Sequence, residues 1–293
     1  MKLKKTLLAA VATLPMVCAP AYAAMQVDNW TLDTSGLAAE IGGTGGVVVN
    51  GIDEILFTAI TRAVSPAGIV PGNPFNTTGI GIATQFNNLD TGIIAPAGFN
   101  STWELSFDWT AGGVYTSVIG PNVNFTHTNA GQIRFYIDDI TGGGKATPGT
   151  GAGYTDGTLF ATFDLLAGEG GVLSLLTSDG SDDASWLMNL AGTLAGVLFD
   201  SENPVNDLKT LVDANGDPIV GLHTDSNFDA APVQGTAPFS FASGGFACGG
   251  TPDDFCAKED GSSVLTVPEP ASLALLGLGL AGMGLFGRRN KKA

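Results

Sequence analysis

Positively charged residues, histidine and cysteine are scarce in this sequence. Its 293 residues include 12 lysines and arginines against 28 aspartates and glutamates, with two histidines and three cysteines. Seven of the basic residues lie among the first five and the last six positions, so residues 24–266 carry 27 acidic and 5 basic side chains, a net charge of −22. Such a surface repels phosphate backbones and anionic lipids, which excludes nucleic acid as a partner.

Signatures of catalysis are also absent. There is no G-x-S-x-G and no H-E-x-x-H, and the Gly-rich segment 142–145 lacks the spacing of a phosphate-binding loop. Only His127 and His223 could serve a Ser-His-Asp site. His127 lies among turn-like polar residues, and His223 ends a strand-like run. We therefore expect no enzyme activity.

A pair of carboxylates for glycoside hydrolysis leaves no local signature, so a glycan-active enzyme stays an alternative. The candidate acids are Glu104, Asp108 and the neighbours Asp138 and Asp139. Strand alternation predicts that Glu104 and Asp108 lie on a solvent-facing side.

One segment resembles a cation-binding loop. Asp213, Asn215 and Asp217 place oxygen ligands at alternate positions, as a calcium loop requires. Pro218 occupies the position where an EF-hand needs glycine, and a β-hairpin turn on Asn215 and Gly216 is the competing interpretation. We favour the turn and expect no cofactor; calcium at this segment is the alternative, and no other metal is indicated.

The N-terminal residues 1–23 have the organisation of a secretory signal peptide. Three lysines precede an apolar run over residues 6–19, and Ala21-Tyr22-Ala23 forms a small-x-small site for signal peptidase. We expect cleavage after Ala23.

The segment 267–293 has three successive parts. Pro268-Glu269-Pro270 is followed by the uncharged apolar run 271–287 and then by a basic cluster that begins with Arg288-Arg289. Seventeen helical residues span about 26 Å, enough for a thin bilayer, so we expect a single transmembrane helix over 271–287. The basic cluster predicts that its end stays in the cytoplasm.

This arrangement resembles the PEP-CTERM sorting signal of Gram-negative bacteria, which the membrane protease exosortase reads. The resemblance implies membrane insertion, exosortase cleavage near Pro268-Glu269-Pro270, and export of the body through the inner membrane to the cell surface or extracellular matrix. A plain membrane anchor that no protease reads is the alternative.

Residues 24–266 are expected to form an all-β, antiparallel, sandwich-like body. Gly is 42 of 293 residues, which disfavours long helices, and short alternating segments recur between turn signals. Segment 103–119 is expected to be a hairpin that turns at Ala111-Gly112-Gly113, and 185–198 is a weak helix candidate. Segments 141–156 and 243–263 are expected to be loops. The sequence leaves one or two β domains open.

Cys248 and Cys256 are the cysteines that remain after the leader is removed, and we expect them to form a local disulfide in an oxidising compartment. Trp30 and Trp186 are the tryptophans freest to stack on sugar rings, whereas Trp103 and Trp109 share an apolar strand face.

The body also resembles the flocculation-associated PEP-CTERM proteins. The shared segments are Trp30-x-Leu32-Asp33, Gly51-Ile52-Asp53-Glu54, Trp103-Glu104-Leu105-Ser106-Phe107, Phe135-Tyr136-Ile137-Asp138 and Ala161-Thr162-Phe163-Asp164-Leu165-Leu166. The resemblance implies a role in cell aggregation, in floc or biofilm, alongside exopolysaccharide. A carbohydrate-binding module that recognises the exopolysaccharide directly is the main alternative.

Overall fold

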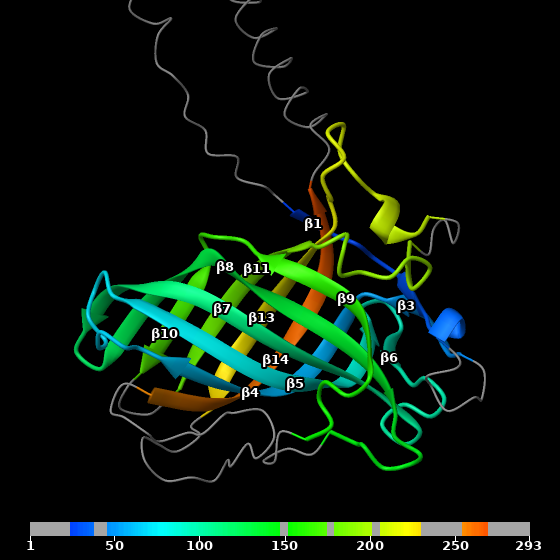
Figure 1. Ribbon diagram of the computed structural model, residues 1–293, viewed down its shortest axis with the longest axis horizontal. Helices are drawn as coiled ribbons and strands as arrows, with labels where there is room; N and C mark the ends of the chain where they lie inside the picture. The colour runs from blue at the N-terminus through cyan, green and yellow to red at the C-terminus, as the bar shows by residue number, and fades with distance from the viewer. Residues whose placement is uncertain are drawn as a thin grey trace, which may run out of the picture. The chain divides into compact units, whose positions relative to one another are not determined.

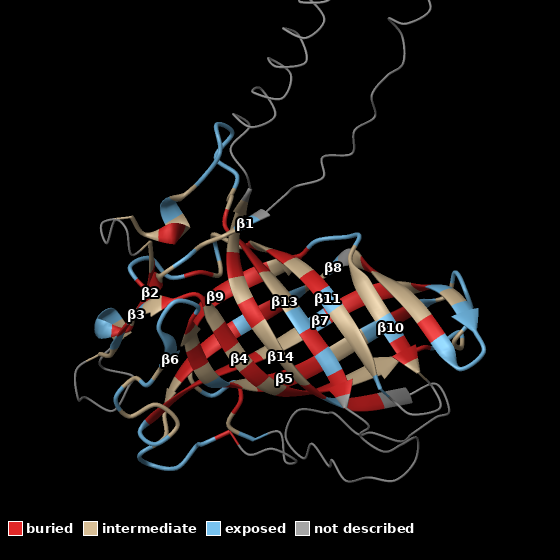
Figure 2. Cartoon of the chain, turned by 180° about the vertical axis from the view of Figure 1, so that it is seen from behind, coloured by how far each residue is buried: buried red, intermediate tan, exposed pale blue. Residues whose placement is uncertain are grey.

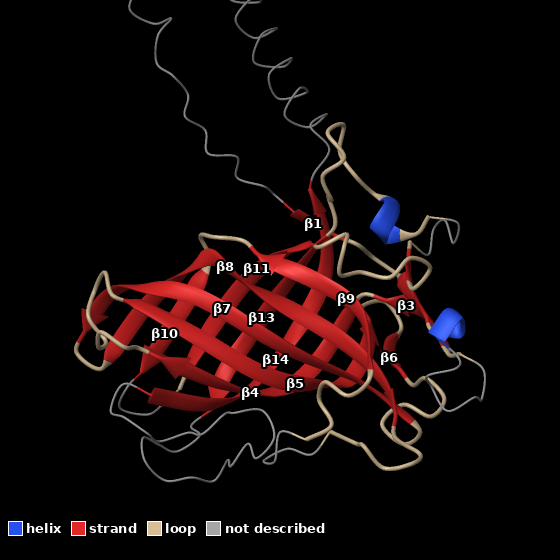
Figure 3. Cartoon of the chain, viewed as in Figure 1, coloured by secondary structure: helices blue, strands red, loops and turns tan. Residues whose placement is uncertain are grey.

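The computed structural model describes residues 24–37, 46–146, 152–174, 179–200, 206–229 and 254–268. Antiparallel strands dominate these residues, and the helical segments among them are two short 3-10 turns (Figure 3). The strands are β1 (Ala24–Gln26), β2 (Trp30–Asp33), β3 (Val48–Ile52), β4 (Glu54–Val64), β5 (Pro74–Asn88), β6 (Gly92–Ile94), β7 (Trp103–Ile119), β8 (Asn122–Asp139), β9 (Thr158–Leu165), β10 (Gly170–Ser174), β11 (Gly180–Met188), β12 (Leu198–Phe199), β13 (Gly221–Asp229) and β14 (Asp254–Pro268). The 3-10 turns are η1 (Ser35–Leu37) and η2 (Leu208–Thr210). The expected all-β, antiparallel class is confirmed.

The main sheet closes on itself (Figure 1). Its strands follow the order β14-β13-β11-β10-β8-β7-β5-β4, and β14 pairs with β4 as well as with β13. β9 and β10 both lie between β8 and β11, so together they fill one position in the circuit. The sequence predicted two facing layers, whereas this closed sheet has one continuous wall around its core. Closure pairs the backbone N–H and C=O groups that the edge strands of an open sheet would leave without hydrogen-bond partners.

Long, bulged strands make this closure feasible. β7 and β8 contain 17 and 18 residues, and their register shifts between Ala111 and Gly113 and between Tyr115 and Ser117. Bulges bend a strand and increase its twist, which curls a sheet toward closure. The predicted hairpin turn at Ala111-Gly112-Gly113 is wrong for this reason: the glycines allow a bulge in a continuous strand. A Cβ on Gly113 would lie 2.2 Å from the ring of Phe75.

Alternation along the strands divides an inner face from an outer one (Figure 2). Inward residues of successive strands form the main core, which includes Phe57, Phe107, Phe135 and Trp186. A three-stranded sheet of β12, β2 and β3 adds Trp30 and other apolar side chains to the same core. The core packs aromatic rings edge to face, as with Phe57 and Phe107, whose centroids are 5.2 Å apart at 81°.

Two further segments differ from the sequence-based expectation. Residues 185–188 belong to β11, so the weak helix candidate over 185–198 is wrong. Residues 254–263, expected to be loop, form the first part of β14, where Gly261 pairs with Phe57 of β4. Their acidic, Gly- and Ser-containing sequence resembles a loop because one face is exposed and the inner face is partly polar. The loop expected over 141–156 contains no named strand among its described residues.

The described strands from Gln26 to Val267 form one compact unit. A buried carboxylate stabilises its end near the three-stranded sheet: Asp53 is 3% exposed and accepts hydrogen bonds from the backbone N–H groups of Asn29 and Leu89, the latter at 2.6 Å. These contacts give Asp53 a structural role.

Candidate functional site

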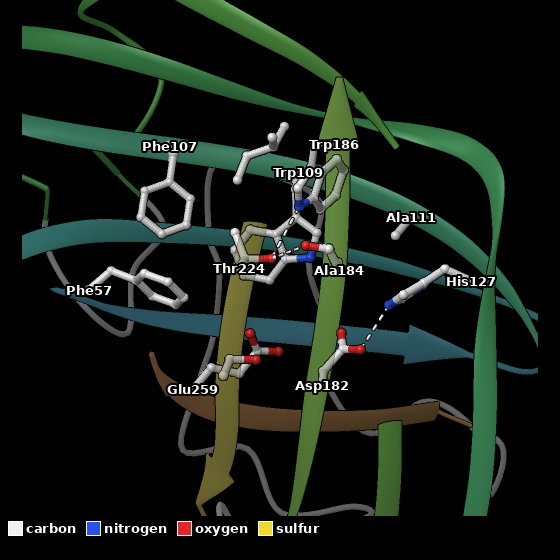
Figure 4. Close-up of a pocket in the computed structure, with 12 residues that line it drawn as sticks. Phe57, Phe107, Trp109, Ala111, His127, Asp182, Ala184, Trp186, Thr224 and Glu259 are labelled. Carbon is white, nitrogen blue, oxygen red and sulfur yellow. Dashed lines mark hydrogen bonds and ion pairs between the residues drawn. The ribbon is translucent and has the colours of Figure 1, made fainter. Parts of the chain in front are cut away.

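The interior of the closed sheet contains a polar cluster surrounded by aromatic rings (Figure 4). His127 comes from β8, Asp182 from β11 and Glu259 from β14. They line a cavity of about 30 Å³ together with Trp109 and Trp186. An adjoining cavity of about 40 Å³ shares Trp109, Asp182 and Glu259. Side chains alternate between the two faces of each strand, and these three polar residues occupy inward-facing positions. The inward-facing residues around them on neighbouring strands are mostly apolar.

Glu259 is the most strongly perturbed acid described in the chain. It is 6% exposed, and burial together with the charge of Asp182 raises its pKa to about 8, against a smaller lowering by hydrogen bonds from Thr61 and Ser226. At neutral pH this side chain is therefore mostly a neutral carboxylic acid, which is the form that burial favours.

His127 and Asp182 form an ion pair or hydrogen bond with Nε2 and Oδ1 2.8 Å apart. The imidazole packs edge-on against Phe75 and Phe125. The backbone N–H of His127 donates to the carbonyl of Glu169 at 2.6 Å. The sequence-based interpretation of His127 as a turn residue is wrong, because it lies within β8 and is 4% exposed.

The interior cavities have the size of solvent sites. A volume of 30 to 40 Å³ holds about two or three waters, whereas ligand pockets usually exceed about 300 Å³. A sugar ring does not fit, so this cluster is a polar part of the core.

A second histidine cluster lies on the outer face of β11 and β13. Ser185 and His223 are register partners, with Oγ and Nδ1 3.5 Å apart, and Oε2 of Glu169 lies 3.6 Å from the same Nδ1. The nearby carboxylate of Glu169 raises the pKa of His223, against a smaller lowering by partial burial. A catalytic triad uses the two ring nitrogens for different partners. Here both partners approach one nitrogen, so the arrangement does not form a triad.

The acids considered for glycoside hydrolysis have structural contacts. Glu104 was expected to face solvent, but it is fully buried, and its Oε1 accepts the N–H of Ala146 at 2.6 Å. Burial raises the pKa of Glu104, with a further contribution from the charge of Asp138. The expectation failed because Ala146 and Tyr154, on either end of the segment between β8 and β9, contact this part of the outer face, at Glu104 and Ser106. Asp108, also expected to face solvent, is half-buried and pairs with Arg134.

The other two acids lie at the end of β8. Burial, and then the charge of Asp156, raises the pKa of Asp138. Asp139 is exposed and accepts hydrogen bonds from the N–H and hydroxyl of Thr141, which lower its pKa.

The segment considered for calcium forms a tight turn. Oδ1 of Asp213 accepts the N–H groups of Asn215 at 2.8 Å and Asp217 at 3.0 Å, and these bonds lower the pKa of Asp213. Gly216 has a φ of +88°, which suits the competing turn interpretation. Across the described ranges, no group of three or more His, Cys, Asp or Glu side chains is placed to hold a metal ion. Calcium binding here stays the alternative.

The tryptophans are not available as sugar-stacking platforms. Trp30 is 3% and Trp186 4% exposed, so the expectation that these two are the freest is wrong. Trp103 is also buried, and Trp109 packs against the main core, as the sequence indicated. Trp186 donates its indole N–H to Oγ1 of Thr224 at 3.1 Å, so this buried donor has a hydrogen-bond partner inside the closed sheet.

Several predicted positions lie outside the described residues. These are the signal-peptide residues Ala21 and Ala23, the sorting residues Glu269, Pro270, Arg288 and Arg289, and Cys248. Cys256 is buried in β14, and its pairing with Cys248 stays a prediction. No helix in the described ranges is long and apolar enough to cross a membrane, and the expected span 271–287 lies beyond them.

The interior acids were missed from the sequence. In β14 the inward row runs Ala257, Glu259, Gly261, Ser263 and Leu265, an alternating pattern with apolar ends. That pattern is detectable once residues 254–263 are assigned to a strand.

Comparison with protein families identifies one segment. Residues 266–291 match the PEP-CTERM protein-sorting motif. Comparisons with curated proteins and with solved structures find no match. The matched residues begin inside β14, which ends at Pro268, the first residue of Pro268-Glu269-Pro270. The motif indicates a protein that is exported to the envelope or surface of a Gram-negative bacterium and targeted to exosortase. The chain therefore carries a PEP-CTERM sorting motif at its C-terminal end.

Proposed function

We propose that this protein is a non-enzymatic surface or matrix component that promotes cell aggregation, in floc or biofilm, together with exopolysaccharide. The observation that carries the proposal is the sorting motif at residues 266–291, which begins in the last residues of β14, the strand that closes the sheet. A folded body whose last strand precedes the processing segment can be released or transferred whole.

The body has the properties of a durable extracellular scaffold. Its strands are paired around a closed circuit, its core is aromatic, and its surface is strongly acidic. High net charge keeps an exported protein soluble and separate from anionic surfaces. Its histidines and the candidate acids described above are engaged in contacts within the fold, which supports a binding or scaffolding role over catalysis.

Deletion and complementation test the proposal. Flocculation and biofilm mass would be compared in the deletion strain, the strain complemented with the wild type, and a strain complemented with Glu269→Ala. We expect deletion to reduce aggregation and the wild type to restore it. Normal aggregation in the deletion strain would remove the proposal.

Intact-mass measurement separates sorting from function. The wild-type product is expected to lack the segment after Pro268-Glu269-Pro270, whereas Glu269→Ala is expected to retain it. A substitution outside the motif, Gln132→Ala on the exposed face of β8, serves as the control for processing. A wild-type product that retains Ala293 would contradict exosortase processing.

A further inference from the structure

A groove of about 400 Å³ lies on the outer face of the closed sheet, across β13, β14, β4 and β5. Its polar lining residues are Thr58, Thr84, Asp225, Asn227, Asp260 and Ser262. The groove is more open to solvent than the interior cavities, and its volume falls in the usual range of ligand sites.

Strand register brings the polar side chains together in two rows. Asp225 pairs with Ser262, which pairs with Leu56, and Asn227 pairs with Asp260, which pairs with Thr58. The side chains of β13 and β4 therefore flank Asp260 and Ser262 of β14.

A bulge adds the remaining polar group. Leu56 pairs with Gln85 and Phe57 with Ala83, so Thr84 is the extra residue of β5. Thr84 is exposed and donates its hydroxyl to the carbonyl of Leu56 at 3.2 Å. Bulges commonly redirect a side chain in this way.

The groove offers hydrogen-bonding capacity that the fold does not use. Within the described part of the chain, no side-chain hydrogen bond is found for Asp225, Asn227 or Ser262, whereas Asp260 pairs with Lys258 at 2.9 Å. A carboxylate, a carboxamide and hydroxyls can together bind neighbouring hydroxyl groups of a ligand as acceptors and donors. Leu56 and Phe57 add apolar surface to the lining, so the groove suits a ligand that carries hydroxyl groups beside apolar C–H surface.

Charge restricts the ligand further. Asp183 is the register partner of Asp225, and it extends the acidic row onto β11. In a body with a net charge of −22, this groove would repel a polymer of uronic acids or phosphates.

We propose that this groove binds a short saccharide segment that carries hydroxyl or amino groups and no acid groups. The inference deepens the proposed function, because it names the surface and the class of polysaccharide through which the protein would act.

Calorimetric titration of the processed protein, purified from its own host, tests the inference. The probes are hexasaccharides of N-acetylglucosamine, of glucosamine and of galacturonate, and calcium chloride alone. We expect binding of a neutral or amino saccharide and none of the uronate. The double variant Asp225→Ala, Asn227→Ala is expected to weaken binding about tenfold or more, since two hydrogen-bonding groups are lost. Gln132→Ala on β8 is the matched exposed control, and melting temperatures check the fold of each variant.

Four outcomes would overturn the inference: no saccharide binding, equal or tighter binding of the uronate, binding of calcium alone, or unchanged affinity in a folded double variant. The same variant in the deletion strain separates the two proposals. Aggregation that persists after saccharide binding is lost leaves the groove as a site but removes its role in aggregation. Normal aggregation in the deletion strain itself rejects the proposed function, whatever the titrations show.

Discussion

Asp182 and Glu259 line the same two interior cavities, although β13 separates their strands. Ser226 of β13 is the register partner of Asp182 and also hydrogen-bonds Glu259. The closed sheet thus buries Glu259 and His127 beside the partly buried Asp182, and the proton on Glu259 limits the cost of burying its carboxyl group.

The first prediction concerns pH. The folded-state pKa of Glu259, about 8, lies above its reference value of 4.5, so the native state holds a proton that the unfolded state releases. Its stabilising contribution is complete below about pH 4.5 and is lost as pH rises through about 8, by roughly 4 to 5 kcal/mol. Denaturant unfolding from pH 5 to 9 should show this loss in the wild type.

Glu259→Gln removes the titrating group, so the free energy of unfolding should change less with pH between pH 5 and 9. Asp260→Asn, the next residue on the outer face, should keep the wild-type slope. An unchanged slope in Glu259→Gln would show that other groups cause the pH dependence.

The second prediction concerns Asp53. Asp53→Ala leaves the N–H groups of Asn29 and Leu89 without their acceptor. We expect a loss of at least about 2 kcal/mol in the free energy of unfolding, because each unsatisfied buried donor costs about 1 to 3 kcal/mol. Asp90→Ala, at an exposed turn, should change it by less than about 0.5 kcal/mol. Equal effects in the two variants would refute the assigned role.

The third prediction concerns packing. A Cβ on Gly81 would lie 2.3 Å from Cζ of Phe107 and 2.9 Å from Cβ of Ala59. Gly81→Ala should therefore destabilise the protein by about 1 to 3 kcal/mol. At Gly142 nothing lies within 4 Å of the added atom, and Gly142→Ala should be nearly neutral. Thermal melts of both variants provide the comparison, and a neutral Gly81→Ala would count against the interior packing.

The fourth prediction is the disulfide between Cys248 and Cys256. Peptide mapping without reductant should recover the two cysteines in one linked pair. Cys248→Ser should lower stability by about 2 to 3 kcal/mol, the chain-entropy value for a short loop. Recovery of alkylated, unlinked Cys256 from the exported protein would reject the pairing.

The fifth prediction concerns the alternative of calcium binding at Asp213, Asn215 and Asp217. If the turn binds calcium, saturating calcium should raise the melting temperature of the wild type but not of Asp217→Ala. An equal response in the two proteins, or none in either, would assign this segment to the hairpin turn alone.

Local sequence patterns predicted much of the strand content. The alternating segments 55–63 and 132–138 lie within β4 and β8, and the described residues of the expected loop, 141–146 and 152–156, belong to no strand of the sheets. These predictions succeeded because strand alternation and glycine-rich loops are local properties of a chain. The hairpin expected within β7 failed because Gly112 and Gly113 permit either a turn or a bulge, and the partner strand decides between them.

The sequence by itself determined that this protein carries a sorting motif, a strongly acidic body and an antiparallel strand content, because charge, motif spacing and alternation are readable along the chain. Only the tertiary structure decided that β14 closes the sheet against β4, that Glu104 is covered by a loop, and that Asp182 and Glu259 share an interior cavity. Those outcomes depend on which distant strands pair and in what register, and a shift of one residue would exchange the inner face for the outer one.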